Sequence, residues 1–180
     1  YVDTNIIGTM NVIQAALDAN VSKVIHTSTS EVYGSAEFVP ITENHPLKGQ
    51  SPYSASKIAA DQISLSYFYS FKLPLTICRP FNTYGPRQSL RAIIPTIITQ
   101  LLKNNDVIKL GELYTTRDFN YIDDTVDGFV ASLLSKNNIG ETINIGSNFE
   151  ISMKNVVDMI INLSGKKVKI TQEKIRIRPK

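Results

Sequence analysis

A tyrosine and a lysine four residues apart are the pair in this chain best suited to acid–base chemistry. Tyr53 and Lys57 lie in the stretch SPYSASK, residues 51–57, where Pro52 suits the first turn of a helix. Residues four apart share a helix face, so the ammonium would lie beside the phenol. A phenol has a pKa of about 10, and an ammonium favours the phenolate; lowering that pKa by ~3 units needs roughly 4 kcal/mol. Taken alone, the same spacing also fits an ordinary helix face.

A second polar stretch, STSEVYG, runs from Ser28 to Gly34 and directly follows the apolar run Val24–Thr27. Its hydroxyls and its one carboxylate, Glu31, end a predicted buried strand. A carboxylate within reach of a substrate could serve as a base. The alternative interpretation is a polar turn that caps the strand.

The elements that must position these residues alternate between strand and helix. Such alternation predicts βαβ units and an α/β fold with a mainly parallel sheet. In these sheets, ligands bind at the carboxyl ends of the strands, so residues 28–31 and 80–82 should share one crevice. From about Val107 the segments shorten and become mixed, which indicates a smaller second lobe. The predicted helices are 6–17, 52–71, 93–102, 124–135 and 152–163; the predicted strands are 24–27, 75–79, 107–110, 117–122, 142–145 and 167–172.

Composition excludes several other classes of protein. The 180 residues are 42% hydrophobic and 19% charged, which is globular composition, and no apolar run approaches the roughly 20 residues of a membrane span. The net charge of +3 arises from basic residues gathered in 166–180, but these alternate with apolar residues and lack interleaved aromatics. We therefore expect an amphipathic strand there, and neither a nucleic-acid nor a membrane partner.

The single cysteine and the two histidines are expected to be structural. Cys78 lies in an apolar run, which favours a buried strand residue over a catalytic thiol, and a lone cysteine mildly favours a reducing compartment. His26 lies in an apolar strand and His45 in a proline-flanked loop, so packing is the expected role of both. No His, Cys, Asp or Glu cluster has metal-ligand spacing, so we expect no metal.

Three motifs, in order, resemble the extended short-chain dehydrogenase/reductases that act on nucleotide sugars: STSEVYG, SPYSASK and RPFNTYGPR (Arg79–Arg87). The stretches at Thr4–Asn11 and Thr116–Asp124 also fit this family. The resemblance implies a Rossmann-like parallel sheet whose N-terminal part is missing, with a smaller mixed α/β substrate-binding lobe. Residues 1–90 would be the C-terminal half of the NAD-binding domain and carry the catalytic residues. Residues 91–180 would be mainly a truncated substrate lobe, with some segments returning to the first domain.

The resemblance also implies roles for single residues. Thr29 would bind the 4-oxygen of the sugar, and Tyr53 would take the 4-hydroxyl proton while hydride leaves C4 for NAD. Lys57 would bind the nicotinamide ribose and depress the tyrosine pKa. The residues expected at the cofactor are Thr27, Ser28, Tyr53, Lys57 and Pro80.

Substrate contacts are implied further along the chain. Asn82 would bind the sugar, and Arg117 and Arg178 would grip the diphosphate, because guanidinium groups form bidentate forks with phosphate. Arg87 and Arg91 are candidates for the sugar or nucleotide site.

Ser30 and Glu31 fall where sugar 4,6-dehydratases of this family place an acid/base pair. Such an enzyme oxidises C4, removes the C5 proton, loses water from C6 and returns the hydride to C6. The product is a 4-keto-6-deoxy sugar. Glu31 would be the C5 base, and Ser30 would assist proton delivery to O6, unless Glu31 serves both steps.

Three alternatives remain open at this point. Within the family, these are a nucleotide-sugar 4-epimerase and a uronic-acid decarboxylase, the latter sharing the Thr-Ser-Glu trio. Outside catalysis, the alternative is a regulator or scaffold that senses a dinucleotide, although such relatives usually lose the tyrosine or the lysine.

The expected partner is a UDP-, GDP- or dTDP-linked hexose. The segment RPFNTYGPRQSLRAIIPTIITQLL is similar to dehydratases that act on nucleotide-linked N-acetylglucosamine in legionaminic-acid-type pathways. By the same resemblance we expect a cytoplasmic homodimer, paired through helices that flank the active site.

The sequence contains no Gly-x-x-Gly-x-x-Gly turn, the segment with which this family binds the dinucleotide pyrophosphate. It also opens on Tyr1 without an initiating Met, so we expect a piece of a longer protein. We predict that these 180 residues alone bind NAD poorly and show little activity. Isothermal titration calorimetry of the isolated chain checks this, and appreciable NAD affinity would contradict it.

Overall fold

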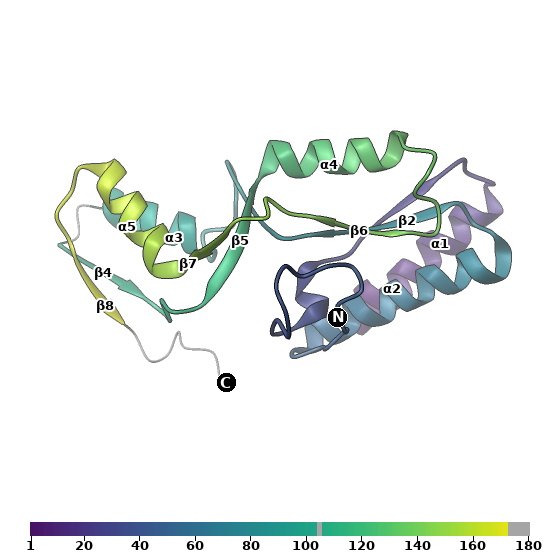
Figure 1. Cartoon of the computed structure of the whole chain (residues 1–180), viewed down its shortest axis with the longest axis horizontal. Helices are drawn as coiled ribbons and strands as arrows, with labels where there is room; N and C mark the ends of the chain where they lie inside the picture. The colour runs from purple at the N-terminus through teal and green to yellow at the C-terminus, as the bar shows by residue number, and fades with distance from the viewer. Residues whose placement is uncertain (104–105, 173–180) are drawn as a thin grey trace. The chain divides into compact units, whose positions relative to one another are not determined.

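The structure is a computed structural model that describes residues 1–103 and 106–172. The chain forms two compact units, which are described separately (Figure 1). The first unit contains Tyr1–Thr83 and Asn120–Ser147, and the second contains Tyr84–Phe119 and Asn148–Lys180. The chain therefore leaves the first unit, returns to it and leaves it again. The assignment of residues 1–90 to cofactor binding and of 91–180 to substrate binding stays a prediction.

A parallel sheet of three strands forms the centre of the first unit, with strand order β1-β2-β6. The strands are β1 (Val24–Thr27), β2 (Leu75–Pro80) and β6 (Thr142–Ile145). Both pairs are parallel, and every residue of β2 from Leu75 to Arg79 is buried. A strand buried on both faces explains the continuous apolar run that predicted it.

Helices cover both faces of this sheet (Figure 1). The long helix α2 (Pro52–Phe71) packs beside α1 (Gly8–Asp18) on one face, and α4 (Ile122–Leu134) lies on the other. A short π-helical segment, η1 (Val2–Ile7), leads into α1. On the α1–α2 side, the buried core is Ile13, Leu73, Leu75 and Ile77.

The start of α2 is defined by a capping box. The Ser51 hydroxyl accepts from the Ser54 amide at 3.1 Å, and the Ser54 hydroxyl accepts from the Ser51 amide at 3.0 Å. Pro52 occupies the first turn, as predicted, where its missing N–H costs nothing. These contacts place Tyr53 in the first turn of the helix.

The second unit contains two helices and short strands. The parallel pair β4–β8 confirms the strand that the alternating basic segment predicted, and β5 pairs antiparallel with β7 in a sheet of order β3-β5-β7. The elements are α3 (Ile93–Leu102), α5 (Met153–Ser164), β3 (Asn82–Tyr84), β4 (Val107–Leu110), β5 (Thr116–Tyr121), β7 (Glu150–Ser152) and β8 (Lys169–Gln172); β3 and β5 cross the boundary between the units.

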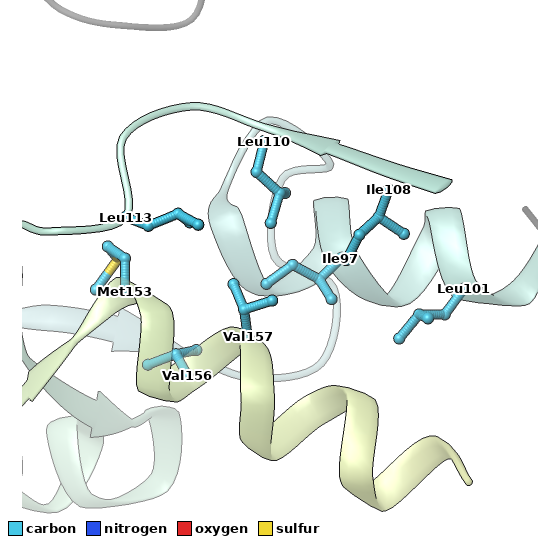
Figure 2. Close-up of a cluster of buried hydrophobic side chains, with 8 residues drawn as sticks. All are labelled: Ile97, Leu101, Ile108, Leu110, Leu113, Met153, Val156 and Val157. Carbon is cyan, nitrogen blue, oxygen red and sulfur yellow. The ribbon is translucent and has the colours of Figure 1, made fainter. Parts of the chain in front are cut away.

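A cluster of eight buried side chains forms the core of the second unit (Figure 2). Ile97 on α3 and Val157 on α5 are both fully buried and point toward each other between the two helices. Ile108 and Leu110 of β4 close the cluster from the strand side, since alternate residues of that strand point inward. This unit thus has an apolar core of its own.

The predicted α/β fold with a parallel sheet is confirmed, and the predicted helices and strands match to within a few residues. The short elements η2 (Ser30–Tyr33), β3 and β7 were not predicted. A helix of four residues and strands of three are too short to give a periodic apolar pattern. Among the described residues, no helix has the length and apolar character needed to cross a membrane.

A glycine before β6 is required by its backbone and its surroundings. Gly140 has φ +84°, and a Cβ there would overlap the Phe68 ring of α2. We predict that Gly140→Ala lowers the free energy of unfolding by about 2–4 kcal/mol, from left-handed strain plus overpacking. Urea unfolding followed by circular dichroism measures this.

Gly165→Ala is the matched control, because Gly165 has φ +66° but nothing within 4 Å of its Cβ position. It should cost only the strain, about 1 kcal/mol. Equal losses for the two variants would contradict the packing argument.

Candidate active site

The carboxyl ends of β1 and β2 and the start of α2 border an open cavity of about 340 Å³ in the first unit. The β1–β2 register pairs Thr27 with Cys78, and the ladder continues through the Ser28 amide, which donates to the Cys78 carbonyl at 2.7 Å. The two strands therefore end at the same edge, and the expected crevice is present. Its lining residues are Ser28, Thr29, Ser30, Glu31, Tyr53, Pro80, Phe81, Asn82 and Thr83.

A single turn of 3-10 helix, η2, carries the carboxylate of the site. Thr29 is extended at its N-cap, and the Thr29 hydroxyl accepts from the Glu31 amide at 3.2 Å. The turn ends at Gly34, whose φ is +68° and where a Cβ would lie 2.6 Å from the Lys48 carbonyl oxygen. Glu31 is thus exposed at the cavity on a turn that is fixed at both ends.

Tyr53 is half-buried, and its environment holds its pKa above the usual value of 10. Burial is the largest cause, because it disfavours the charged phenolate. The side chain of Thr29 acts in the opposite direction by hydrogen bonding, whereas the negative charge of Glu31 raises the pKa further. The Tyr1 ring packs 5.7 Å from the Tyr53 ring. The phenol is therefore in electrostatic contact with both Thr29 and Glu31.

Lys57 bonds the backbone of β1. Its Nζ donates to the Thr27 carbonyl oxygen at 2.6 Å. Burial lowers the pKa of Lys57, and the charge of Asp61, one turn further along α2, partly offsets that effect. Because Tyr53 has a raised pKa here, depression of that pKa by Lys57 stays a prediction for the site with its cofactor.

The remaining predicted cofactor residues differ in their surroundings. Ser28 is buried, and its hydroxyl donates to Asp61 at 2.8 Å, so this side chain points into the protein interior. Thr27 offers its carbonyl to Lys57, while Pro80 lines the cavity at the end of β2. Ser30, predicted to assist at O6, also lines the cavity, beside Glu31.

The predicted substrate residues are divided between the two units. Asn82 lines the cavity, whereas Arg87, Arg91 and Arg117 belong to the second unit. Arg87 and Arg91 are exposed, and one Arg117 nitrogen donates to the Thr116 carbonyl oxygen at 2.7 Å. Arg178 lies outside the described residues.

A buried polar network that was not predicted from the sequence lies behind the cavity. Asp61, fully buried on α2, accepts from Arg79 at the end of β2, through Nε at 3.1 Å and Nη2 at 3.0 Å. Arg79 Nη1 also donates to the Tyr33 hydroxyl at 3.0 Å, and Tyr33 donates to the Asn144 side-chain oxygen at 2.7 Å. The one available signal was an aspartate four residues after Lys57, on the same helix face.

The cysteine and the histidines are structural, as predicted. Cys78 is buried in β2, and burial raises the pKa of its thiol. His45 is buried and its Nε2 accepts from the Glu37 amide at 2.9 Å; His26 is buried with its Nε2 3.2 Å from Asp61. Within residues 1–103 and 106–172, no group of three or more His, Cys, Asp or Glu side chains could hold a metal ion.

The site combines Thr-Ser-Glu at the end of β1 with Tyr-x-x-x-Lys on the helix α2. This is the arrangement that the resemblance to the short-chain dehydrogenase/reductases predicted. The family model described as GDP-mannose 4,6 dehydratase matches residues 1–180. The chain therefore belongs to this family, within the extended short-chain dehydrogenase/reductases.

Individual relatives agree with this assignment. The dTDP-D-glucose 4,6-dehydratase of Dictyostelium discoideum is 39% identical over 175 residues, which cover 91% of this chain and 40% of that protein. The chain spans about half the length of the curated relatives it matches.

Two solved structures resemble this chain in both sequence and fold. The UDP-glucuronic acid 4-epimerase of Bacillus cereus, in complex with UDP-glucuronic acid and NAD, is 36% identical with a TM-score of 0.89. The dTDP-glucose 4,6-dehydratase of Streptomyces venezuelae, with NAD bound, is 32% identical with a TM-score of 0.88. In each case, 97% of this chain and 55% of the other chain are covered.

The electrostatics of the cavity predict opposite effects of two substitutions on Tyr53. Glu31→Gln removes a negative charge that disfavours the phenolate, so the pKa of Tyr53 should fall. Thr29→Val removes a hydroxyl that favours the phenolate, so the pKa should rise. NMR titration of tyrosine labelled at Cζ, assigned with Tyr53→Phe, measures both shifts. Shifts of the same sign would contradict this account of the cavity.

Proposed function

We propose that this chain is part of an NAD-dependent nucleotide-sugar 4,6-dehydratase, a hydro-lyase. The observation that carries the proposal is the exposed carboxylate of Glu31 in the same cavity as Tyr53 and Thr29. Oxidation at C4 needs one base, but elimination of water needs a second group that removes the C5 proton. Glu31 supplies that group.

The comparisons support this reaction class. Curated relatives in several organisms are dTDP-glucose 4,6-dehydratases, and similar solved structures contain NAD. Because the chain spans only about half of these relatives, the activity, cofactor and substrates of the whole protein are proposals.

The residues that line the cavity, together with Thr27 and Lys57 beside it, fit the nicotinamide end of NAD. The half-buried Lys57 ammonium, beside the end of β1, is a donor for ribose hydroxyls, with Tyr53 one helical turn before it. The carbonyl of Thr27, the backbone of Ser28 and Pro80 would border the ring. When bound there, NAD would supply the hydride acceptor for oxidation at C4 and the hydride donor for reduction at C6.

The protein residues would act in sequence around that transfer. Thr29 donates a hydrogen bond to the sugar 4-oxygen, and Tyr53 takes the 4-hydroxyl proton. With C4 a ketone, the C5 proton becomes acidic and Glu31 removes it. Glu31, which then carries the C5 proton, would protonate the departing O6 hydroxyl so that it leaves as water, with Ser30 assisting. Hydride return to C6 would leave an enolate, and C5 would then take up one proton, which balances the one that Tyr53 removed from the 4-hydroxyl.

The family resemblance assigns substrate-binding roles to residues of each unit. Asn82 lines the cavity and would contact the sugar. Arg117, and Arg178 beyond the described residues, would bind the diphosphate, with Arg87 and Arg91 as further candidates. A UDP-, GDP- or dTDP-linked hexose fits this set of donors.

A nucleotide-sugar 4-epimerase is the second candidate, favoured by the UDP-glucuronic acid 4-epimerase structures. An epimerase moves hydride on and off C4 and leaves the C5 proton in place. Glu31 has no such task in that reaction, so its presence in the cavity favours the dehydratase.

The proposal extends to assembly and location. The large apolar residues Met10 and Val12 of α1, and Tyr69 and Phe71 of α2, are exposed, which supports pairing of two copies through these helices. A cytoplasmic homodimer without nucleic-acid or membrane partners follows from the family resemblance.

Product analysis of the full-length protein tests the function. With dTDP-glucose, GDP-mannose and UDP-N-acetylglucosamine offered separately, a 4-keto-6-deoxy product is expected from at least one, detected by mass spectrometry and NMR. Glu31→Gln should still oxidise C4, while formation of this product falls by about 10²- to 10⁴-fold.

Glu37→Gln is the control, since Glu37 is exposed outside the cavity and pairs with Lys48 at 3.7 Å. It should react like the wild type. A 4-epimer as the sole product would exclude the dehydratase and favour the second candidate.

A further inference from the structure

The Asp61 carboxylate lies behind the cavity, fully buried, and one of its oxygens accepts three hydrogen bonds. Oδ2 accepts from the Ser28 hydroxyl at 2.8 Å and from two nitrogens of Arg79, at 3.1 and 3.0 Å. Arg79 is itself 3% exposed. This is a charged pair removed from water, and such a pair is retained only where its geometry is well satisfied.

The two residues that donate hydrogen bonds to Asp61 adjoin the cavity. Ser28 itself lines the cavity, and Arg79 immediately precedes Pro80, which also lines it. Asp61 lies one helical turn beyond Lys57 and acts on that lysine electrostatically. The pair therefore links β1, β2 and α2 at the point where all three reach the site.

The other side of Arg79 reaches the turn that carries Glu31. Arg79 Nη1 donates to the hydroxyl of Tyr33, the last residue of η2, and the Arg79 guanidinium lies 5.0 Å from the centre of the Tyr33 ring. The chain around Glu31 is thus anchored on both sides, through Ser28 before it and through Tyr33 after it.

The second oxygen of Asp61 faces β1. His26 Nε2 lies 3.2 Å from Asp61 Oδ1, and neither atom makes a hydrogen bond within the part of the chain that the structure describes. The charged and titratable groups facing the carboxylate are therefore Arg79 from β2, His26 from β1 and Lys57 from its own helix.

We propose that the buried Asp61–Arg79 pair is a positioning element that fixes the two strand ends, η2 and the Lys57 turn of α2 relative to one another. Neither residue lines the cavity, so neither touches the reacting atoms. Asp61 and Arg79 act on the positions of the groups that do line the cavity. Small displacements of catalytic groups can lower a reaction rate strongly. The catalytic part of this inference rests on the proposed function.

Substitutions at Asp61, Ser28 and Ser64 of the full-length protein, with one double variant, test the proposal. Asp61→Asn weakens the pair, and Ser28→Ala removes the side-chain link to Asp61 while keeping the Ser28 backbone at the cavity. Ser64→Ala is the control, because Ser64 is fully buried on the same helix and its hydroxyl donates only to the Ala60 carbonyl oxygen among the described contacts. All are assayed at a temperature at which circular dichroism shows them folded.

In Asp61→Asn, kcat should fall by about 10- to 100-fold with KM within about threefold of the wild type. The kcat of Ser28→Ala should fall less, by about 3- to 10-fold, and the kcat of Ser64→Ala should equal that of the wild type. The double variant Asp61→Leu/Arg79→Met, which leaves no buried charge unpaired, should regain thermal stability relative to Asp61→Leu but not kcat. Recovery of kcat together with stability would overturn the proposal.

A second readout does not need turnover. The Lys57 ammonium, observed by NMR with lysine labelled at Cε and assigned with Lys57→Arg, should titrate at lower pH in Asp61→Asn, because a nearby negative charge is lost. If the wild type turns over no tested sugar nucleotide, the proposed function fails and this titration alone decides the inference. With an inactive wild type, an unchanged Lys57 titration in Asp61→Asn would overturn the inference. With an active wild type, an unchanged kcat in both Ser28→Ala and Asp61→Asn would overturn it.

Discussion

The buried ion pair between Asp61 and Arg79 is the constraint on which the arrangement of the first unit depends. Removing one partner of such a pair commonly costs 3–5 kcal/mol, because the other charge is left in a medium that cannot solvate it. A position of α2 along β2 in which these two side chains do not meet would therefore be disfavoured by an energy of this order. Tyr53 and Lys57 precede Asp61 on that helix, so their positions at the strand ends follow from the same contact.

The cavity combines one carboxylate, Glu31, with one phenol, Tyr53, and the charge of the first disfavours ionisation of the second. Glu31 raises the pKa of Tyr53, although a phenolate is the form that the proposed reaction requires. The Thr29 hydroxyl offsets part of this effect, and Lys57 lies one turn away. A site that kept only Tyr53, Lys57 and Thr29 would ionise the phenol more easily, but it would have no group for the C5 proton. In the proposed reaction, this conflict would be the physical cost of adding elimination to oxidation.

Much of the fold could be predicted from the sequence because its elements are long and periodic. The apolar runs of β1 and β2 and the serine–proline start of α2 are local signals, and the carboxyl-end rule brings Thr29, Glu31 and Asn82 to one edge. The pairing of Asp61 with Arg79 could not be predicted, because the two residues lie on different elements and only folding brings them together. The sequence also did not predict the partner of Ser28, whose hydroxyl faces the interior on the same side as His26, because Asp61 reaches this position only when α2 packs against the sheet.

The alternation in β1 has a consequence for how this site can change during evolution. His26 and Ser28, two residues apart, both face Asp61, whereas Thr29 lies at the cavity. An insertion or deletion of one residue between Val24 and Ser28 would exchange the inward and outward positions, so that Thr29, proposed to contact the substrate, would turn inward and Ser28 would turn away from Asp61. A point substitution alters one of these side chains at a time, whereas a one-residue change in the length of the strand moves all of them to the opposite face at once.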